Sequence, residues 1–465
     1  MRKSGLLRVA LASLVLLILC AAVVHAAVKP NGLISDGAVL QQGMPVPIWG
    51  SAADGEKVTV IFQGQTASTV AQDGKWMVRL KPLAPGGPFT MTIAGENTIE
   101  LKNMMVGEVW IASGQSNMWW TIDRSADADR VKAASTDPML HLFTVPHADL
   151  QAPAADVTGA WQEAGPTTIG GFSAVAYFFG RDLRKALNVP VGIINSSVGG
   201  TSAQQWTRRS FLEADPQLAG AVTPNTGGLY NGMIAPLLPY ALRGAIWYQG
   251  ESNAGAAYQY RTLFPGTIRN WREDWGERDL VFLFVQLAPF QAVDFLPKES
   301  AWAELREAQL LTSLRVPRTG MAVITDVGDP VDIHPIWKEP VGGRLALLAL
   351  RIAHGKPVVD NGPLYKSMQV SGRYVTLSFD YVDGGLVAKG ADLTGFAVAG
   401  EDRTFVNARA RIQGDRIIVW SARVDHPVAV RFGWADCPVV NLFNQAGLPA
   451  SPFRTDDFPM VTGPK

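Results

Sequence analysis

The 465-residue chain carries 41 basic and 41 acidic side chains, so its formal net charge is zero. This balance provides no excess of basic residues for binding nucleic acid, and we expect no nucleic-acid partner. With 47% hydrophobic residues, the chain is long enough and apolar enough to form two or three domains, each with a core.

The first 26 residues have the pattern of a secretory signal peptide. Basic Arg2, Lys3 and Arg8 precede an apolar run at 11–20, and a small-residue end closes the segment at 24–26. We therefore expect residues 1–26 to be removed and the mature chain to be secreted, into a bacterial periplasm or outside the cell. No other stretch has the length and apolar character of a membrane span, so we expect no membrane anchor in the mature chain.

Two regions of the chain have the pattern of β-structure. In the first, short alternating runs such as 58–61 are separated by turns rich in glycine, aspartate and asparagine. The last part of the chain shows similar runs, for example at 374–379. We predict an N-terminal β domain over residues 27–105 and a C-terminal β domain over residues 357–465, both sandwich-like.

Residues 106–356 alternate strand-like and helix-like segments, which is typical of a parallel sheet covered by helices on both faces. The expected strands are 108–113, 191–195, 243–248, 280–287 and 320–326, and the expected helices are 173–187, 256–272, 299–314 and 340–353. Ser173 is a suitable N-cap for the first helix. The predicted fold class is therefore α/β, and in such sheets ligands bind beyond the carboxyl ends of the strands.

Chemically useful residues follow four of these expected strands. Ser116 follows the first, Gly199 and Gly200 follow the second, Gln-Gly-Glu at 249–251 follows the third, and His334 lies in an acid-rich loop after the last. A serine after a strand is often only a turn residue or a helix cap. A serine and a histidine brought to one sheet edge with acids favour acyl transfer through a serine nucleophile.

Four short motifs carry a family resemblance: Gly-Gln-Ser-Asn-Met (114–118), Trp-Tyr-Gln-Gly-Glu-Ser-Asn (247–253), Asp-Ile-His-Pro (332–335) and Gly-Arg-Leu-Ala (343–346). With them, the chain resembles the SGNH (GDSL-like) hydrolases and, among these, the sialate O-acetylesterase family, which includes bacterial acetyl-xylan esterases. The resemblance implies an SGNH-hydrolase-like three-layer α/β/α domain. It also implies an enzyme that removes acetyl groups from sugars without a cofactor.

Ester hydrolysis requires a nucleophile, a base and a group that orients the base. Ser116 is the candidate nucleophile. Of the six histidines, His334 is the candidate base because it alone lies in an acid-rich loop between an expected strand and an expected helix. We favour Asp332 as the orienting acid, since it fits the Asp-x-His-Pro motif of the resembling family. Glu251 and Asp329 remain alternatives.

The oxyanion formed during the reaction needs hydrogen-bond donors. We expect these to be the N–H of Ser116, the N–H of Gly199 or Gly200, and the side-chain amide of Gln249, with Asn253 as the alternative amide. The histidines are scattered and the two cysteines do not cluster, so we expect no metal site.

The resemblance alone implies that the substrate is an acetylated sugar, and it allows both O-acetylated sialic acid and acetylated xylan. Trp119 and Trp120, beside the candidate nucleophile, suit either a core or a wall on which a sugar stacks. Two other functions are retained as alternatives. One is a catalytically inactive carbohydrate-binding protein, and the other is a lipolytic esterase of the same superfamily. The sequence does not indicate an oligomeric state.

Overall fold

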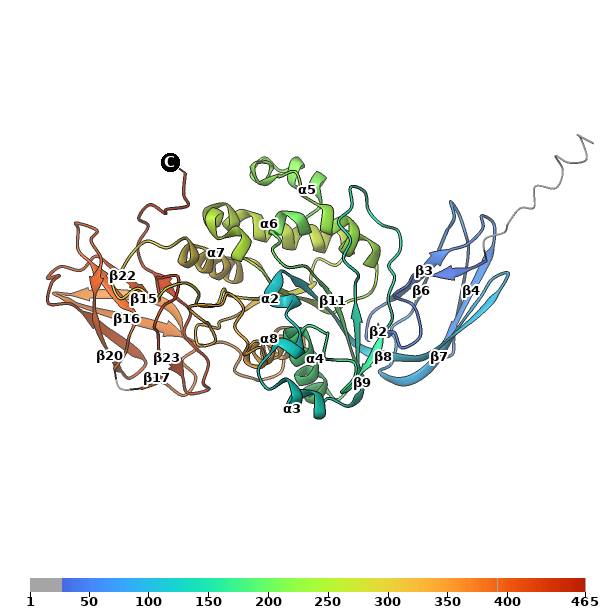
Figure 1. The fold of residues 1–465 in the computed structure, drawn as a ribbon, viewed down its shortest axis with the longest axis horizontal. Helices are drawn as coiled ribbons and strands as arrows, with labels where there is room; N and C mark the ends of the chain where they lie inside the picture. Colours follow the sequence, from blue (N-terminus) through green and yellow to red (C-terminus); the bar gives the residue numbers. More distant parts are fainter. Residues whose placement is uncertain (1–26, 391, 465) are drawn as a thin grey trace, which may run out of the picture.

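The computed structural model of the protein describes residues 27–390 and 392–464. The predicted signal peptide, residues 1–26, lies outside this range. An α/β region occupies the middle of the molecule, with one β region on each side of it (Figure 1).

The N-terminal β region is built from β1 (Lys29–Pro30), β2 (Val39–Gln41), β3 (Val46–Ser51), β4 (Lys57–Phe62), β5 (Gln65–Val70), β6 (Lys75–Leu80) and β7 (Gly86–Ala94). One sheet has the order β1-β3-β6, and a second sheet joins β4, β5 and β7 to the following strand. In β6 every second residue is buried, namely Trp76, Val78 and Leu80. This alternation is expected for a strand with one face on a core and one in water.

Strand β8 (Thr98–Gly114) connects the N-terminal region to the central sheet. Its first half pairs with β7, and its second half lies between β11 (Val191–Ser197) and β12 (Gly244–Tyr248). Residue 105, where we place the end of the N-terminal domain, lies inside this strand. Within β8, every residue from Met104 to Gly114 is buried, because here the sheet is covered on both faces. One hydrophobic core therefore continues from the N-terminal sheets to one face of the central sheet.

The central sheet has the order β10-β9-β11-β8-β12-β13-β14. The remaining strands are β9 (Asp137–Thr144), β10 (Gln162–Ala164), β13 (Val281–Val285) and β14 (Thr319–Ala322). All neighbours are parallel except the edge strand β10, which is antiparallel to β9. The five expected strands are all present. Strands β9 and β10 were not among the expected strands. His141, in β9, is buried beside the carbonyls of Gly37 and Pro138.

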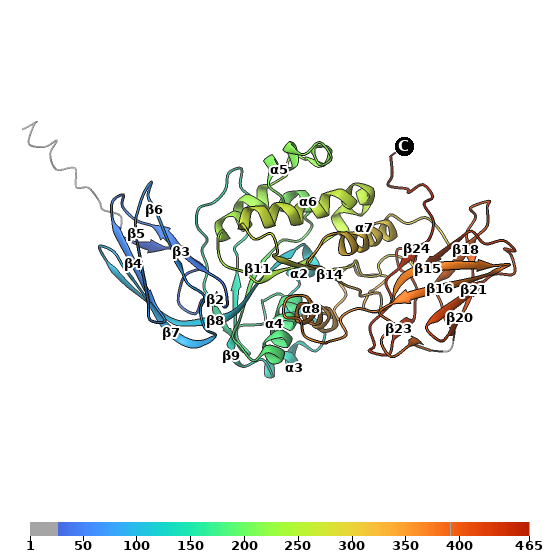
Figure 2. The same cartoon turned by 180° about the vertical axis from the view of Figure 1, so that it is seen from behind.

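Four long helices cover the sheet: α4 (Ala174–Leu187), α6 (Ala257–Trp275), α7 (Ala301–Arg315) and α8 (Glu339–Ile352). Helices α4 and α8 lie on one face, and α6 and α7 on the other (Figures 1 and 2). The short helices are α2 (Ser116–Trp119), α3 (Ala128–Ala133) and α5 (Arg209–Ala214). The predicted cap is confirmed, since Ser173 Oγ accepts a hydrogen bond from Ala176 N at 3.2 Å. The expected three-layer α/β/α arrangement is confirmed.

The C-terminal β region contains two four-stranded sheets, ordered β15-β16-β21-β20 and β19-β18-β22-β24, and the pair β17-β23. Its strands are β15 (Leu364–Ser371), β16 (Tyr374–Asp380), β17 (Leu386–Ala388), β18 (Phe396–Ala399), β19 (Val406–Asn407), β20 (Arg409–Gln413), β21 (Arg416–Trp420), β22 (Ala429–Phe432), β23 (Leu442–Asn444) and β24 (Phe453–Arg454). Side chains from both sheets form a core of their own.

A buried arginine attaches the C-terminal region to the helices. Arg306, in α7, is fully buried and donates hydrogen bonds to Ala435 O at 2.7 Å and Asp436 O at 2.8 Å. Among the residues that the structure describes, no helix combines the length and apolar character needed to cross a membrane.

Candidate active site

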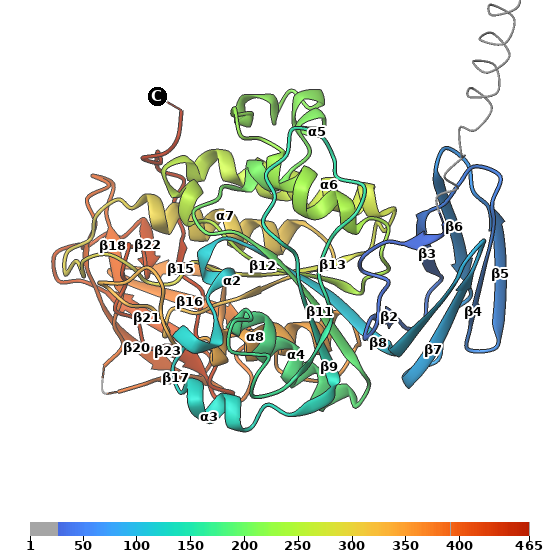
Figure 3. The ribbon, with the colours of Figure 1, turned by 45° about the vertical axis from the view of Figure 1, so that its right-hand side comes forward.

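Ser116 is placed at the end of β8 by a glycine that no other residue can replace without strain. Gly114 has φ +132°, and a Cβ built on it would lie 2.2 Å from Tyr248 O on the neighbouring β12. The chain then turns, Gln115 N donates to Tyr248 O at 2.9 Å, and Ser116 begins α2. Figure 3 shows α2 between the helix layer of α6 and α7 and the layer of α4 and α8. Half-buried Ser116 is thus presented beyond the carboxyl end of its strand.

The glycines that follow β11 lie beside this serine. A Cβ built on Gly199 would be 3.4 Å from Ser116 Cβ, so nothing stands between the two residues. Gly200 has φ +73° and faces open space. Within the described chain, no residue accepts a hydrogen bond from the backbone N–H of Ser116, Gly199 or Gly200. These three N–H groups are therefore available to a ligand that binds against Ser116.

His334 lies in the loop between β14 and α8, and its own loop orients it. Asp332 Oδ1 accepts a hydrogen bond from the backbone N of His334 at 2.8 Å and lies 3.2 Å from the ring Nδ1. This pairing leaves Nε2 as the ring nitrogen free to accept a proton. Asp329 has a different place, because its Oδ1 accepts from the backbone N–H groups of Val331 and Asp332 and shapes the turn.

Trp120 holds the imidazole from the other side. Its ring stacks on His334 with centroids 4.8 Å apart and planes 12° apart. Trp120 directly follows α2, so the same short helix that begins at Ser116 ends against His334. Burial lowers the pKa of His334 despite the opposing effect of Asp332, and this favours the neutral ring that a general base needs.

Asn117 connects the serine turn to the two other strand ends. Its Nδ2 donates to Glu251 Oε1 at 2.7 Å and to Ile333 O at 3.0 Å, and its Oδ1 accepts from Lys338 Nζ. Within the described residues Glu251 thus bonds to Asn117 and has no hydrogen bond with His334. Burial raises the pKa of the Glu251 carboxyl. Asp332 therefore contacts His334, whereas Glu251 contacts Asn117, the residue that follows Ser116.

The two side-chain amides that we expected at the oxyanion bond to other parts of the protein. Gln249 is fully buried, and its Nε2 donates to Thr201 O at 3.2 Å and to Asn253 Oδ1 at 2.7 Å. Asn253 Nδ2 in turn donates to Gln204 Oε1 at 3.0 Å. In this arrangement both amides support the loop that follows Gly200, and the free donors at Ser116 are backbone N–H groups. The roles of Gln249 and Asn253 as oxyanion donors stay predictions.

The positions of three residues in the site were not predicted from the sequence. Asn117 lies within the Gly-Gln-Ser-Asn-Met motif, so its position beside Ser116 was a usable signal. Trp120 was considered only as a core or sugar-binding residue, and Lys338 belongs to no quoted motif. In the part of the chain that the structure describes, no three His, Cys, Asp or Glu side chains gather in a way that could hold a metal ion.

Comparison with known proteins identifies the family. Residues 106–334 match the family model described as carbohydrate esterase, sialic acid-specific acetylesterase. Rat sialate O-acetylesterase is 31% identical over 409 residues, covering 72% of this chain and 75% of the relative. The chain belongs to the sialate O-acetylesterase family. The human member is also 31% identical, over 379 residues that cover 72% of each chain.

A solved structure extends the similarity over most of this esterase. A carbohydrate acetylesterase from Xanthomonas citri is 42% identical, with a TM-score of 0.87, and the match covers 92% of this chain and 100% of that one. The esterase is therefore a carboxylic ester hydrolase with a three-layer α/β/α domain and additional β regions, as predicted. Carbohydrate O-acetyl esters are the class of substrate on which its family acts.

Proposed function

We propose that this esterase removes acetyl groups from sugars through an acetyl-serine intermediate, with Ser116 as the nucleophile, His334 as the base and Asp332 as the group that orients the base. One observation carries the assignment. The helix that starts at Ser116 ends against the ring of His334, whose Nδ1 lies on Asp332 and whose Nε2 is left free. These contacts support a serine nucleophile that works with an oriented histidine base.

In the first step, Ser116 Oγ attacks the acetyl carbonyl carbon while His334 Nε2 takes the hydroxyl proton. The negative charge that develops on the carbonyl oxygen is stabilised by the N–H groups of Ser116 and of Gly199 or Gly200, and one such donor contributes on the order of 3 kcal/mol. His334 then gives its proton to the departing sugar oxygen. In the second step, water loses a proton to His334 and attacks the acetyl-serine, which releases acetate and restores Ser116.

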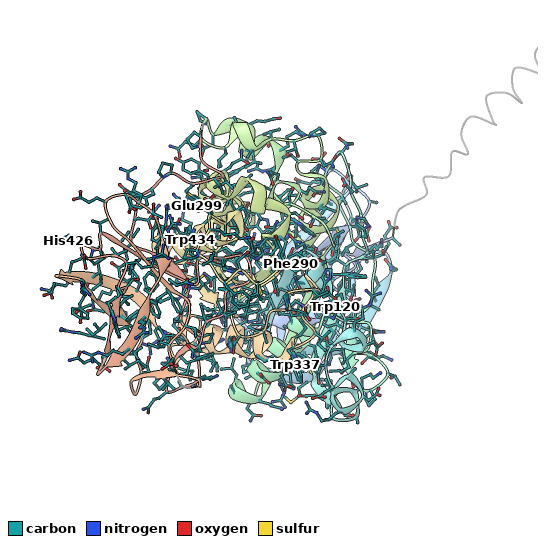
Figure 4. The ribbon with its side chains drawn as sticks, turned by 60° about the vertical axis from the view of Figure 1, so that its left-hand side comes forward. Trp120, Phe290, Glu299, Trp337, His426 and Trp434 are labelled. Atoms are coloured by element: carbon teal, nitrogen blue, oxygen red, sulfur yellow. The ribbon has the colours of Figure 1, made fainter. Side chains whose placement is uncertain are left out.

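Exposed aromatic rings near the histidine loop suit a sugar. Trp119 is 43% exposed and Trp337 is 54% exposed, although both are large and apolar. Figure 4 places Trp120 and Trp337 over the central region, apart from Trp434 on the C-terminal β region. Such rings bind the apolar faces of sugars while leaving their hydroxyls in water. O-acetylated sialic acid and acetylated xylan are both candidate substrates.

Acetate release distinguishes these substrates. The mature chain, residues 27–465, and its Ser116→Ala variant are assayed on O-acetylated sialic acid, on acetylated xylo-oligosaccharides and on 4-nitrophenyl acetate. We expect release from at least one acetylated sugar by the wild type, and none above background by Ser116→Ala, whose fold is checked by circular dichroism. Activity that rises with acyl chain length would instead support a lipolytic esterase, and glycan binding without any release would support a binding protein.

We also propose that the esterase is secreted, into a bacterial periplasm or to the outside of the cell. The basis is the signal-peptide pattern of residues 1–26. Expression of the full chain in a Gram-negative host, followed by cell fractionation and intact-mass measurement, tests this. A product in the cytoplasm that retains residues 1–26 would contradict the proposal.

A further inference from the structure

A buried lysine, Lys338, is hydrogen-bonded to Asn117, the residue that follows Ser116. Lys338 precedes α8 and is only 1% exposed. Its ammonium donates to Asn117 Oδ1 and lies 5.8 Å from the ring centroid of Trp120 and 5.5 Å from that of Tyr248. A lysine is almost never buried to this extent without a partner, because removing its charge from water is costly. Its position therefore calls for an explanation.

The acceptor of this lysine is the residue next to the nucleophile. Asn117 uses its amide oxygen for Lys338 and its amide nitrogen for Glu251 and for the carbonyl of Ile333, the residue before His334. Through this one side chain, Lys338 connects the turn that carries Ser116 to the loop that carries the base. None of these contacts uses an atom that the reaction itself requires.

The charges around the lysine and the histidine are few. Glu251 and Asp332 face Lys338, and Asp332, Lys338 and Arg124 face His334. Burial lowers the pKa of Lys338 to about 7, against the opposing effect of Glu251 and Asp332. The pKa of His334 is also lowered, chiefly by burial, and the positive charges of Lys338 and Arg124 contribute to this.

We propose that Lys338 is a positioning residue for the reaction: through Asn117 it holds the serine turn against the histidine loop, and its ammonium disfavours a second positive charge on His334. The inference rests on the proposed roles of Ser116 and His334. Glu251 completes the arrangement as the buried counter-charge of Lys338. Lys338 neither touches the substrate nor exchanges a proton with it.

The test is the pH profile of Lys338→Met on 4-nitrophenyl acetate. We expect kcat to fall on the order of 10- to 100-fold, the cost of a small misplacement of reacting groups, with KM changed by less than about threefold. We also expect the acidic limb of kcat/KM to move to higher pH, because the cation that disfavours protonation of His334 is gone. Lys356→Met removes an exposed lysine after the other end of α8 and serves as the matched control, with a profile like that of the wild type.

The outcomes separate this inference from the proposed function. Equal activity of wild type and Ser116→Ala would reject the function itself. An active wild type, an inactive Ser116→Ala and a Lys338→Met profile that superimposes on the wild type would reject only the role of Lys338. If Lys338→Met does not fold, the double variant Lys338→Met/Glu251→Gln, which removes both buried charges, is measured instead. An unmoved acidic limb in that variant would also overturn the inference.

Discussion

The choice between Asp332 and Glu251 as the group that orients His334 is tested by comparing Asp332→Asn with Glu251→Gln. Each substitution keeps the size and hydrogen-bonding capacity of the side chain and removes its charge. Asparagine at 332 can still accept from the backbone N of His334, as Asp332 Oδ1 does at 2.8 Å. Glutamine at 251 can still accept from Asn117, as Glu251 Oε1 does at 2.7 Å. The two variants therefore isolate the effect of charge.

The expected magnitude follows from the contact with the histidine. When His334 takes the serine proton, its Nδ1–H faces the carboxylate oxygen at 3.2 Å. Two unit charges at that separation attract each other by about 1.3 kcal/mol in bulk water and about 5 kcal/mol at an effective dielectric constant of 20. The side chain of Asp332 is 54% exposed, so solvent screens the pair and the lower part of this range applies. We take about 2 kcal/mol, which corresponds to a loss in kcat of about 30-fold.

Glu251→Gln should cost less, under about tenfold in kcat, because Glu251 bonds to Asn117 and has no hydrogen bond with His334 in the described structure. The assay is steady-state hydrolysis of 4-nitrophenyl acetate by both variants at pH 7 to 8, with thermal unfolding as the control for folding. A larger loss for Glu251→Gln than for Asp332→Asn, at equal stability, would refute the assignment of Asp332.

Three further predictions concern the base, the glycines and the buried amide. The kcat/KM of the wild type should fall as the pH decreases through a pKa below the ordinary histidine value of 6.5. The reason is that the proposed base is neutral His334 and that burial disfavours its protonation. An acidic limb centred above 6.5 would contradict this. Gly199→Ala should fold like the wild type but lose activity, since the new methyl would lie 3.4 Å from Ser116 Cβ, whereas Gly200→Ala, at φ +73°, should lower the free energy of unfolding by about 1 kcal/mol. Equal stabilities for the two variants in urea denaturation would refute the distinction. Gln249→Ala should lower the free energy of unfolding by about 1 to 3 kcal/mol, because it leaves buried partners such as the Tyr260 hydroxyl unpaired. A variant with unchanged stability and a greatly reduced kcat would contradict this and would support Gln249 as an oxyanion donor.

The sequence by itself determined the architecture of the central region and led to Ser116 and His334 as the proposed reactive pair. Strands buried on both faces must be apolar throughout, so β12 and β13 are visible as short apolar runs, and helix α4 is visible through its spacing and its Ser173 cap. Parallel strands place their carboxyl ends at one edge, which is why Ser116 and His334 are predictable as neighbours although 218 positions separate them in the numbering. The family motifs added the reaction.

Only the tertiary structure decided which polar groups are free to act. Gln249 and Glu251 have the right chemistry for a donor and an acid, but Gln249 bonds to Thr201 and Asn253, and Glu251 bonds to Asn117. A sequence shows which hydrogen-bonding groups exist but not how they pair. A buried polar group needs a hydrogen-bond partner, and that partner often comes from a distant part of the chain. For the same physical reason Lys338 could not be recognised from its neighbours: its significance lies in an acceptor 221 residues away.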